Sequence, residues 1–254
     1  MRLDKRMRLI CSAAWALEAI LCAMPAGAEA PKLESVEAVL TRYQQALGGV
    51  EAIRAVQSET RRAEVESSAA PGKTKILFYA KPFRQFVKIT RPDGREITTG
   101  FDGAVSWTVT AEAASIDHDT PVESDRRDSD LQYALHQTDY FEKLEFAGVT
   151  DFEGCRCYWL RGTTHWGKNN NQFYDTETGL LAGYRFQQDA RNSVAVTTLQ
   201  FKDYKSFGGP LVATRLITRT GDAVRTISIL SVSYEPVADS LFELPAPVRA
   251  LLKS

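Results

Sequence analysis

The chain has 254 residues and carries 31 basic and 32 acidic side chains, so its formal net charge is only −1. This balance excludes the basic surface with which nucleic-acid-binding proteins neutralise phosphates, and we expect no nucleic-acid partner. With 44% hydrophobic and 25% charged residues, the composition is that of a globular protein. The length permits one large β domain or two small ones.

Residues 1–28 have the composition of a secretory signal peptide. A cationic start is followed by a mostly apolar run over residues 9–24 and then by small residues. The run is shorter than the ~20 residues that span a bilayer. We expect cleavage near Ala28 and an exported mature protein in which residues 29–254 form a single domain. Only Cys155 and Cys157 would then remain, in an oxidising compartment where disulfides can persist.

An amphipathic helix is predicted for residues 33–47. Its apolar side chains recur at three- and four-residue steps and form one stripe: Leu33, Val36, Leu40, Tyr43 and Leu47. Two glycines follow, as is typical of a helix C-terminus, and residues 50–56 predict one more short helical piece. The stripe should lie on an apolar surface.

From residue 57 onward the sequence predicts a β-rich domain, because short runs of β-branched and aromatic residues alternate with polar residues between turn signals. The predicted strands cover residues 57–66, 73–80, 84–90, 95–101, 104–110, 144–151, 156–161, 170–175, 180–188, 193–204, 211–219 and 223–234. A charged loop is expected at residues 117–130, and a second helix from Leu131 to Lys143. The short connections favour one large antiparallel sheet, so the expected fold class is α+β, mainly β.

The stretch TTGFDGAVSWTV, residues 98–109, contains a strong hairpin signal, because Asp-Gly stands between two alternating runs. A two-residue loop would leave Ile97 and Trp107 on opposite faces of the sheet. A three-residue loop places both on one face, and we favour it because register follows the buried face. That face would also carry Thr99, Val105 and Val109. Asp102 is then expected to be a turn residue and not an acid catalyst.

Five short motifs stand in a particular order along the chain. They are Tyr43-x-x-Ala46-Leu47-Gly48-Gly49, Lys81-Pro82 before a β-rich run, Phe101-Asp102-Gly103-x-x-x-Trp107, the segment from Tyr174 to Leu180, and Asp239-Ser240-Leu241-Phe242-x-Leu244-Pro245. Their order resembles the LolA/LolB-like superfamily of periplasmic lipoprotein carriers and outer-membrane lipoprotein-sorting proteins. The resemblance implies an incomplete, half-open barrel, in which helices cover the concave face of a curved antiparallel sheet and acyl chains are held inside.

The resemblance further implies a periplasmic, non-enzymatic carrier or binder of lipid or acylated lipoprotein, monomeric and without a cofactor, with an envelope membrane protein as a further partner. The candidate cavity residues are Trp107, Val105, Val109, Ile97, Val87, Ile89, Leu40 and Tyr43. The same alternation also describes a filled core. In that case the protein would be an envelope sensor or interaction module of the same fold, with a protein partner.

Cys155 and Cys157 allow three interpretations, since their side chains should point to the same side of a strand. They can be reduced, form a strained disulfide or bind a metal; the usual spacing of further zinc ligands is absent, and no metal site is expected. The hydrolase motifs G-x-S-x-G and H-E-x-x-H are also absent. His118 stands between two aspartates, but it lies in the most polar part of the chain, which favours solvated surface over a catalytic site.

Overall fold

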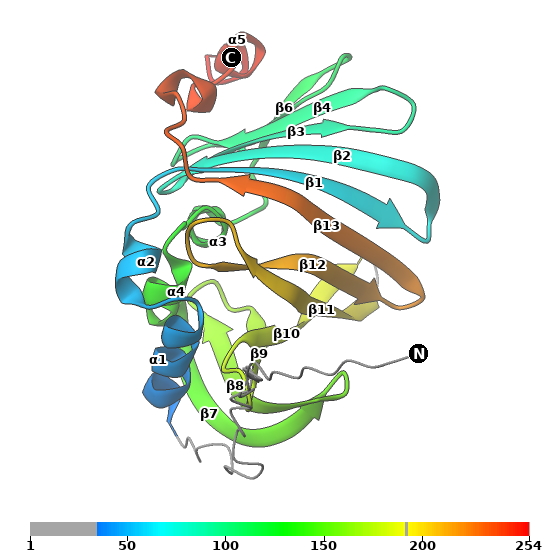
Figure 1. Ribbon diagram of the computed structural model, residues 1–254. Coiled ribbons are helices and arrows are strands. Elements are labelled where there is room, and N and C mark those ends of the chain that lie inside the picture. The colour runs from blue at the N-terminus through cyan, green and yellow to red at the C-terminus, as the bar shows by residue number, and fades with distance from the viewer. Residues whose placement is uncertain (1–34, 191–192, 254) are drawn as a thin grey trace, which may run out of the picture. The chain divides into compact units, whose positions relative to one another are not determined.

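The computed structural model describes residues 35–190 and 193–253 (Figure 1). The predicted signal peptide, residues 1–28, lies outside the described residues. Within the described ranges, no helix is long and apolar enough to cross a membrane.

The described chain consists mainly of β-strands with a few short helices. The helices are α1 (Val36–Ala46), α2 (Val50–Arg54), α3 (Val122–Asp128), α4 (Tyr133–His136) and α5 (Ala246–Leu251), with the 3₁₀ helices η1 (Gln137–Tyr140) and η2 (Asp239–Phe242). The strands are β1 (Glu59–Ser67), β2 (Ala70–Lys81), β3 (Arg84–Thr90), β4 (Glu96–Phe101), β5 (Ser106–Val109), β6 (Ala114–Asp117), β7 (Phe141–Phe152), β8 (Cys155–Thr164), β9 (Asn169–Asp175), β10 (Leu181–Ala190), β11 (Ser193–Ser206), β12 (Leu211–Thr220) and β13 (Ala223–Ser233). Each predicted strand has a counterpart here.

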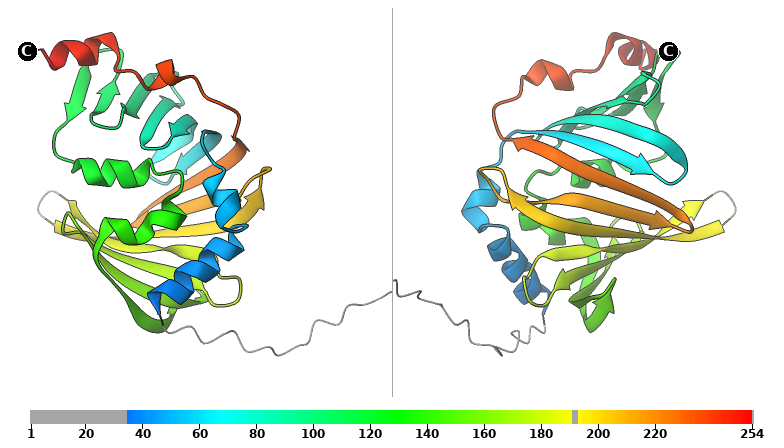
Figure 2. Two further views of the ribbon diagram at one scale, coloured as in Figure 1. Left: turned by 90° about the vertical axis from the view of Figure 1, so that its left-hand side faces the viewer. Right: turned by 45° about the vertical axis from the view of Figure 1, so that its right-hand side comes forward.

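The strands pair in one antiparallel sheet with the order β6-β5-β4-β3-β2-β1-β13-β12-β11-β10-β9-β8-β7. The chain runs as two meanders, β1–β6 and β7–β13, which join where β1 pairs with β13. Within the described chain β6 and β7 are the two edges and do not pair with each other, so the curved sheet is not closed into a barrel (Figures 1 and 2). The predicted half-open, mainly β fold is confirmed.

Helices cover the concave face of this sheet, as predicted. Because β6 and β7 are at opposite edges, residues 118–140 must cross from one edge to the other, and they do so through α3, α4 and η1 (Figure 2). On the same side, α1 packs against α4 and β7, and α2 packs against α4. The C-terminal helix α5 packs against β5 and β6 on the side of the sheet away from α3.

Helix α1 forms where the apolar stripe predicts it. The Ser35 side chain caps the N-terminus by accepting the backbone N–H of Ala38 at 3.1 Å. Val39 and Leu40 are buried, and the helix ends before Gly48, whose φ of 118° is open to glycine at little cost. The predicted helix is confirmed from Val36 to Ala46, and the short helical piece after it is confirmed as α2; Leu33, the first residue of the predicted stripe, lies outside the described residues.

The second predicted helix, Leu131 to Lys143, is wrong over most of its length. Only residues 133–136 are α-helical, a 3₁₀ turn follows, and β7 begins at Phe141. Phe141 pairs with Thr164 of β8 and is buried, so this apolar residue belongs to the sheet and not to a helix stripe. The predicted charged loop, residues 117–130, contains α3.

The β4–β5 hairpin has a four-residue loop, and the predicted three-residue loop is wrong. Gly100 pairs directly with Trp107, which leaves residues 102–105 in the loop. Oδ1 of Asp102 accepts the backbone N–H groups of Ala104 at 2.9 Å and Val105 at 2.8 Å. The predicted turn role of Asp102 is therefore confirmed, although the register is not.

The extra loop residue decides which face each side chain occupies. Trp107 shares a face with Phe86, and their ring centroids are 6.0 Å apart. Ile97 pairs with Ile89 and lies on the opposite face, which in the neighbouring strands also carries Phe78. Trp107 and Ile97 therefore do not share the face on which the sequence analysis placed them.

Replacing Gly100 with Ala should destabilise the β4–β5 hairpin, since a Cβ at this position would lie 2.5 Å from Cζ2 of Trp107. Overpacking of this kind costs about 1–3 kcal/mol, so we expect a lower urea midpoint at an unchanged slope. Ser115→Ala, at an exposed position of β6, is the control and should keep the wild-type midpoint. Equal midpoints for the two variants would contradict the Gly100–Trp107 contact.

Candidate ligand-binding site

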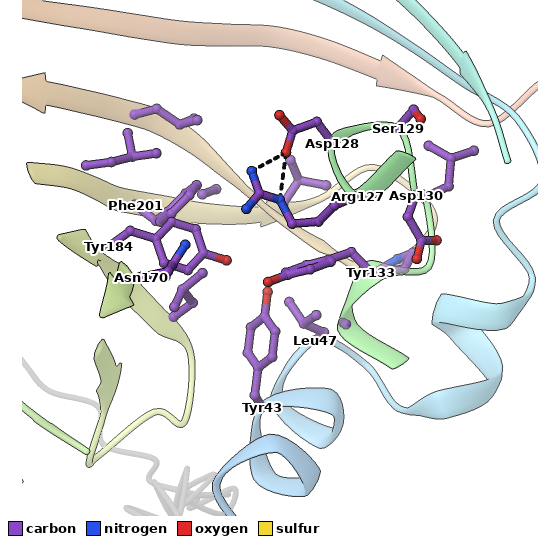
Figure 3. A pocket seen from close by; sticks show the side chains of 18 of the residues that line it. Tyr43, Leu47, Arg127, Asp128, Ser129, Asp130, Tyr133, Asn170, Tyr184 and Phe201 are labelled. Carbon is purple, nitrogen blue, oxygen red and sulfur yellow. Dashed lines mark hydrogen bonds and ion pairs between the residues drawn. The ribbon is translucent and has the colours of Figure 1, made fainter. Parts of the chain in front are cut away.

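A cavity of about 820 Å³ lies between the concave face of the sheet and helices α1 to α4 (Figure 3). Strands β1, β2 and β8–β12 contribute its floor, and the segment from α3 to α4 contributes part of its cover. This volume is within the range of about 300–1,000 Å³ that is usual for small-molecule sites. The concave face is thus not completely filled by side chains.

The walls of the cavity are mostly apolar, and several of their residues come from the inward-facing rows of the strands. Leu199 and Phe201 are two residues apart on β11 and both line the cavity, as strand alternation requires. Leu211, at the start of β12, continues this wall, and Leu47 and Ile53 close it from the side of α1 and α2. Such a surface suits hydrocarbon.

Three tyrosines place their hydroxyl groups in the middle of this apolar space. Tyr43 comes from α1, Tyr133 from α4 and Tyr184 from β10, and Figure 3 shows the hydroxyls of Tyr43 and Tyr133 directed toward each other. Burial raises the pKa of Tyr133 to about 12 and raises the pKa values of Tyr43 and Tyr184 well above their usual range. All three phenols are therefore neutral hydrogen-bond donors at neutral pH.

Arg127 of α3 extends into the cavity above the tyrosines (Figure 3). Its Nε and Nη2 donate to Oδ1 of Asp128 at 2.9 and 2.7 Å, and its guanidinium lies 5.1 Å from the ring centroid of Trp166. Burial acts to lower the pKa of Arg127, but the charge and hydrogen bonds of Asp128 outweigh it and raise the pKa. The guanidinium is therefore a permanent positive charge in the cavity.

Two other charged groups in the lining are matched by partners close by. Glu59 is 3% exposed and is ion-paired with Arg61, whose Nη2 donates to Oε2 at 3.0 Å. Asp130 accepts the Tyr140 hydroxyl at 2.8 Å and lies 2.9 Å from Nδ1 of His136. Neither carboxylate is left without a donor, as buried charges require.

No protein-family model matches the chain, and no curated protein matches it. Solved structures do match. One is a LolA superfamily protein from Nitrosomonas europaea, with 12% identity and a TM-score of 0.58 over 84% of this chain and 99% of that one. The described chain has the LolA-like fold.

Two further solved structures support this assignment. A DUF1329 family protein from Desulfovibrio piger matches with 16% identity and a TM-score of 0.58 over 85% of this chain and 100% of that one. A putative outer membrane lipoprotein-sorting protein domain from Vibrio parahaemolyticus matches with 11% identity and a TM-score of 0.56 over 86% of this chain and 99% of that one. At these identities the likeness establishes the fold.

Of the eight residues that the sequence analysis proposed for the cavity, one lines it in the structure. Tyr43 lines the cavity, and Leu40 is buried beneath α1 in the adjoining core. Trp107 is 3% exposed and lies on the face opposite to Phe78, which does line the cavity. The remaining candidates are outside the cavity lining: Val105, Val109, Ile97, Val87 and Ile89.

The sequence analysis missed three residues in the centre of the cavity. Arg127 was hidden in a stretch interpreted as a charged loop, and Tyr133 in a helix whose stripe was wrongly assigned. Tyr184 could have been found from the sequence. Residues 180–188 were predicted as a strand, and Leu199 and Phe201 mark the apolar face of the next predicted strand, on which a paired Tyr184 would also lie.

Cys155 and Cys157 are free thiols, so the possible disulfide is not present in the structure. Cys157 is completely buried, and Sγ of Cys155 donates to Oδ2 of Asp175 at 3.1 Å. Burial and this carboxylate raise the pKa of Cys155 to about 11, which makes it a poor nucleophile. Within the described residues there is no group of three or more His, Cys, Asp and Glu side chains that could hold a metal.

The buried phenols predict a loss of stability at alkaline pH, which Tyr43→Phe should reduce. Tyr43 ionises above pH ~10 in the unfolded chain but stays protonated in the folded one. The unfolded state then binds fewer protons, so the stabilising contribution is complete below pH ~10 and declines as the pH rises. The free energy of unfolding, measured by urea denaturation between neutral pH and pH ~11, should fall less steeply for the variant, by up to about 1.4 kcal/mol per pH unit. Parallel curves would contradict the burial of this phenol.

Proposed function

We propose that this protein is an exported, periplasmic, non-enzymatic carrier or binder that holds the acyl chains of a lipid or of an acylated lipoprotein. The observation that carries the proposal is the mostly apolar cavity of about 820 Å³ beneath the helices of a LolA-like fold. The lipoprotein-sorting domain from Vibrio parahaemolyticus with the same fold supports the choice of acylated ligands. An envelope membrane protein would be the donor or receiver of the ligand.

Burial of hydrocarbon would supply the binding energy. Each CH₂ group removed from water contributes about 0.8 kcal/mol, so a palmitoyl chain would gain on the order of 10 kcal/mol before the costs of association. A chain bound this strongly leaves slowly unless its cover moves. The moving parts in this proposal are α1 and the segment containing α3, α4 and η1.

A hydrolase that uses the aspartates beside His118 has less support. Asp117 is the last residue of the edge strand β6 and lies outside the cavity lining, and its Oδ1 accepts the backbone N–H groups of Asp119 at 2.9 Å and Thr120 at 3.1 Å. The hydrogen bond from the Thr120 hydroxyl lowers the pKa of Asp117. This carboxylate shapes a turn, and a binder is therefore the proposal that we retain.

Filling the cavity tests the proposal. Ala213 lies on β12 opposite Tyr204, and both line the cavity, so Ala213→Trp would place an indole in the space for the chain. We expect binding of a fluorescent fatty acid to weaken at least about tenfold, equivalent to about 1.4 kcal/mol, with an unchanged far-UV circular dichroism spectrum. Ala223→Trp, the same change at an exposed site in the β12–β13 hairpin, should bind like the wild type.

Two results would contradict the proposal. One is a wild-type protein that binds no acyl probe and carries no lipid in native mass spectra after isolation from the periplasm. The other is equal binding by Ala213→Trp and Ala223→Trp, since a chain in the cavity must compete with the new indole.

A further inference from the structure

We propose that the cavity selects amphiphiles with an anionic head group, a phosphate or a carboxylate, which Arg127 binds together with the hydroxyls of Tyr43, Tyr133 and Tyr184. This inference rests on the proposed function, because it identifies the class of head group that accompanies the acyl chain. It does not follow from the fold, which requires only an apolar interior.

The first argument is the unused donor of Arg127. Its Nε and Nη2 both donate to Asp128, whereas Nη1 has no hydrogen-bond acceptor among the described residues. Figure 3 shows this nitrogen on the side of the guanidinium that faces Tyr184, and both residues line the cavity. A charged donor aimed into an apolar cavity is best satisfied by an oxyanion, which forms a short, charge-assisted hydrogen bond.

The second argument is that neutral donors converge on the same place. Tyr43, Tyr133 and Tyr184 come from three different elements and line the same cavity, and each phenol influences the ionisation of another. Tyr133 and Tyr184 also interact electrostatically with Arg127. Because burial keeps the phenols protonated, they present O–H groups beside a fixed positive charge, and this combination suits an anion with several acceptor oxygens.

The third argument is the charge balance of the lining. Glu59 is ion-paired with Arg61, and Asp130 accepts the Tyr140 hydroxyl and lies beside His136, so neither carboxylate needs Arg127 as a partner. Among the described residues Asp128 is the acidic partner of Arg127, and its side chain is 54% exposed, so solvent screens part of its charge. The surroundings of Arg127 therefore favour an anion over a cationic or neutral head group.

The apolar residues around the polar centre fit the rest of such a ligand. Leu47 and Phe201 flank the tyrosines in Figure 3, and Leu211 continues the wall at the start of β12. A head group at Arg127 would direct its chain along this wall. The ligand would thus be held by its charge at one point and by hydrocarbon burial elsewhere.

The test compares three palmitoyl compounds as competitors of a fluorescent acyl probe bound to the delipidated protein, each below its micelle concentration. They are 1-palmitoylglycerol, which is neutral, palmitate, which carries a carboxylate, and palmitoyl lysophosphatidate, which carries a phosphate. We expect at least one anionic compound to bind the wild type about tenfold more tightly than the neutral one, equivalent to about 1.4 kcal/mol. The anionic compound that binds more tightly, palmitate or palmitoyl lysophosphatidate, identifies the head group as a carboxylate or a phosphate.

Arg127→Met should bring the three affinities to within about twofold of one another, chiefly by weakening the binding of the two anionic compounds. Arg95→Met is the matched control, because Arg95 also pairs with a nearby aspartate, at 2.7 Å from Asp93, but on an exposed turn. Tyr133→Phe removes only a hydroxyl and should reduce the preference about threefold, which provides a second test in case Arg127→Met folds poorly.

The possible outcomes separate this inference from the proposed function. Equal wild-type affinities for neutral and anionic compounds would overturn the inference and leave acyl-chain binding intact. A preference for anions that survives in both Arg127→Met and Tyr133→Phe would overturn it as well. Failure of all three compounds to displace the probe, or of the probe to bind, would overturn the proposed function and the inference together.

Discussion

The pairing of β1 with β13 is the constraint on which the rest of this structure depends. It brings together strands from the two ends of the domain, with Thr60 opposite Ser233 and Ser67 opposite Arg225, and thereby joins two meanders into one sheet. Once they are joined, β6 and β7 must lie at opposite edges, and the chain between them must cross the concave face. Arg127 and Tyr133 reach the cavity for this reason.

Side chains that bond to backbone carbonyls connect the crossing segment to the N-terminal helices. Gln44 of α1 donates to the carbonyl of Ala134 at 2.9 Å, and Gln132 donates to that of Arg54 at 2.9 Å. Each such bond contributes only about 0.5–1.5 kcal/mol net. Ala134 also belongs to the same apolar core as Leu40, so the cover is held by packing as well as by directional bonds, whereas the sheet is held by continuous strand pairing.

Helix α1 is also attached to the β9–β10 turn, and Gly179 leaves the room that this contact needs. Nη2 of Arg42 on α1 donates to the carbonyls of Thr176 and Glu177 at 2.9 and 2.7 Å, in the β9–β10 turn. A Cβ at Gly179 would lie 2.8 Å from Cγ of Arg42, so a larger residue there would displace the arginine. The φ of 76° at Gly179 also lies in the left-handed region, which glycine adopts at little cost.

The sequence predicts local features of this fold well and tertiary ones poorly. The alternation of apolar residues locates the strands, and the turn roles of Asp102 and Gly179 follow from local hydrogen bonding and backbone freedom. The face of Trp107 does not follow, because one additional loop residue inverts it and loop length has only a weak signature. The local sequence pattern does not identify Arg127, because α3 is positioned by tertiary contacts. Asp125 of α3 accepts the hydroxyl of Ser106 on β5 at 2.6 Å, and this contact exists only after the sheet has formed.

The polar centre of the cavity has an energetic consequence for any hydrocarbon bound there. Arg127 and the phenol of Tyr43 would be desolvated by a purely apolar ligand without gaining a new partner, which opposes binding. The apolar walls alone would bind a chain more tightly if the centre were also apolar. Polar groups at this position therefore lower the affinity for hydrocarbon in general and raise the discrimination between amphiphiles. The sheet and its cover provide the volume, and Arg127 and Tyr133, brought across by the β6–β7 connection, give that volume its polar centre.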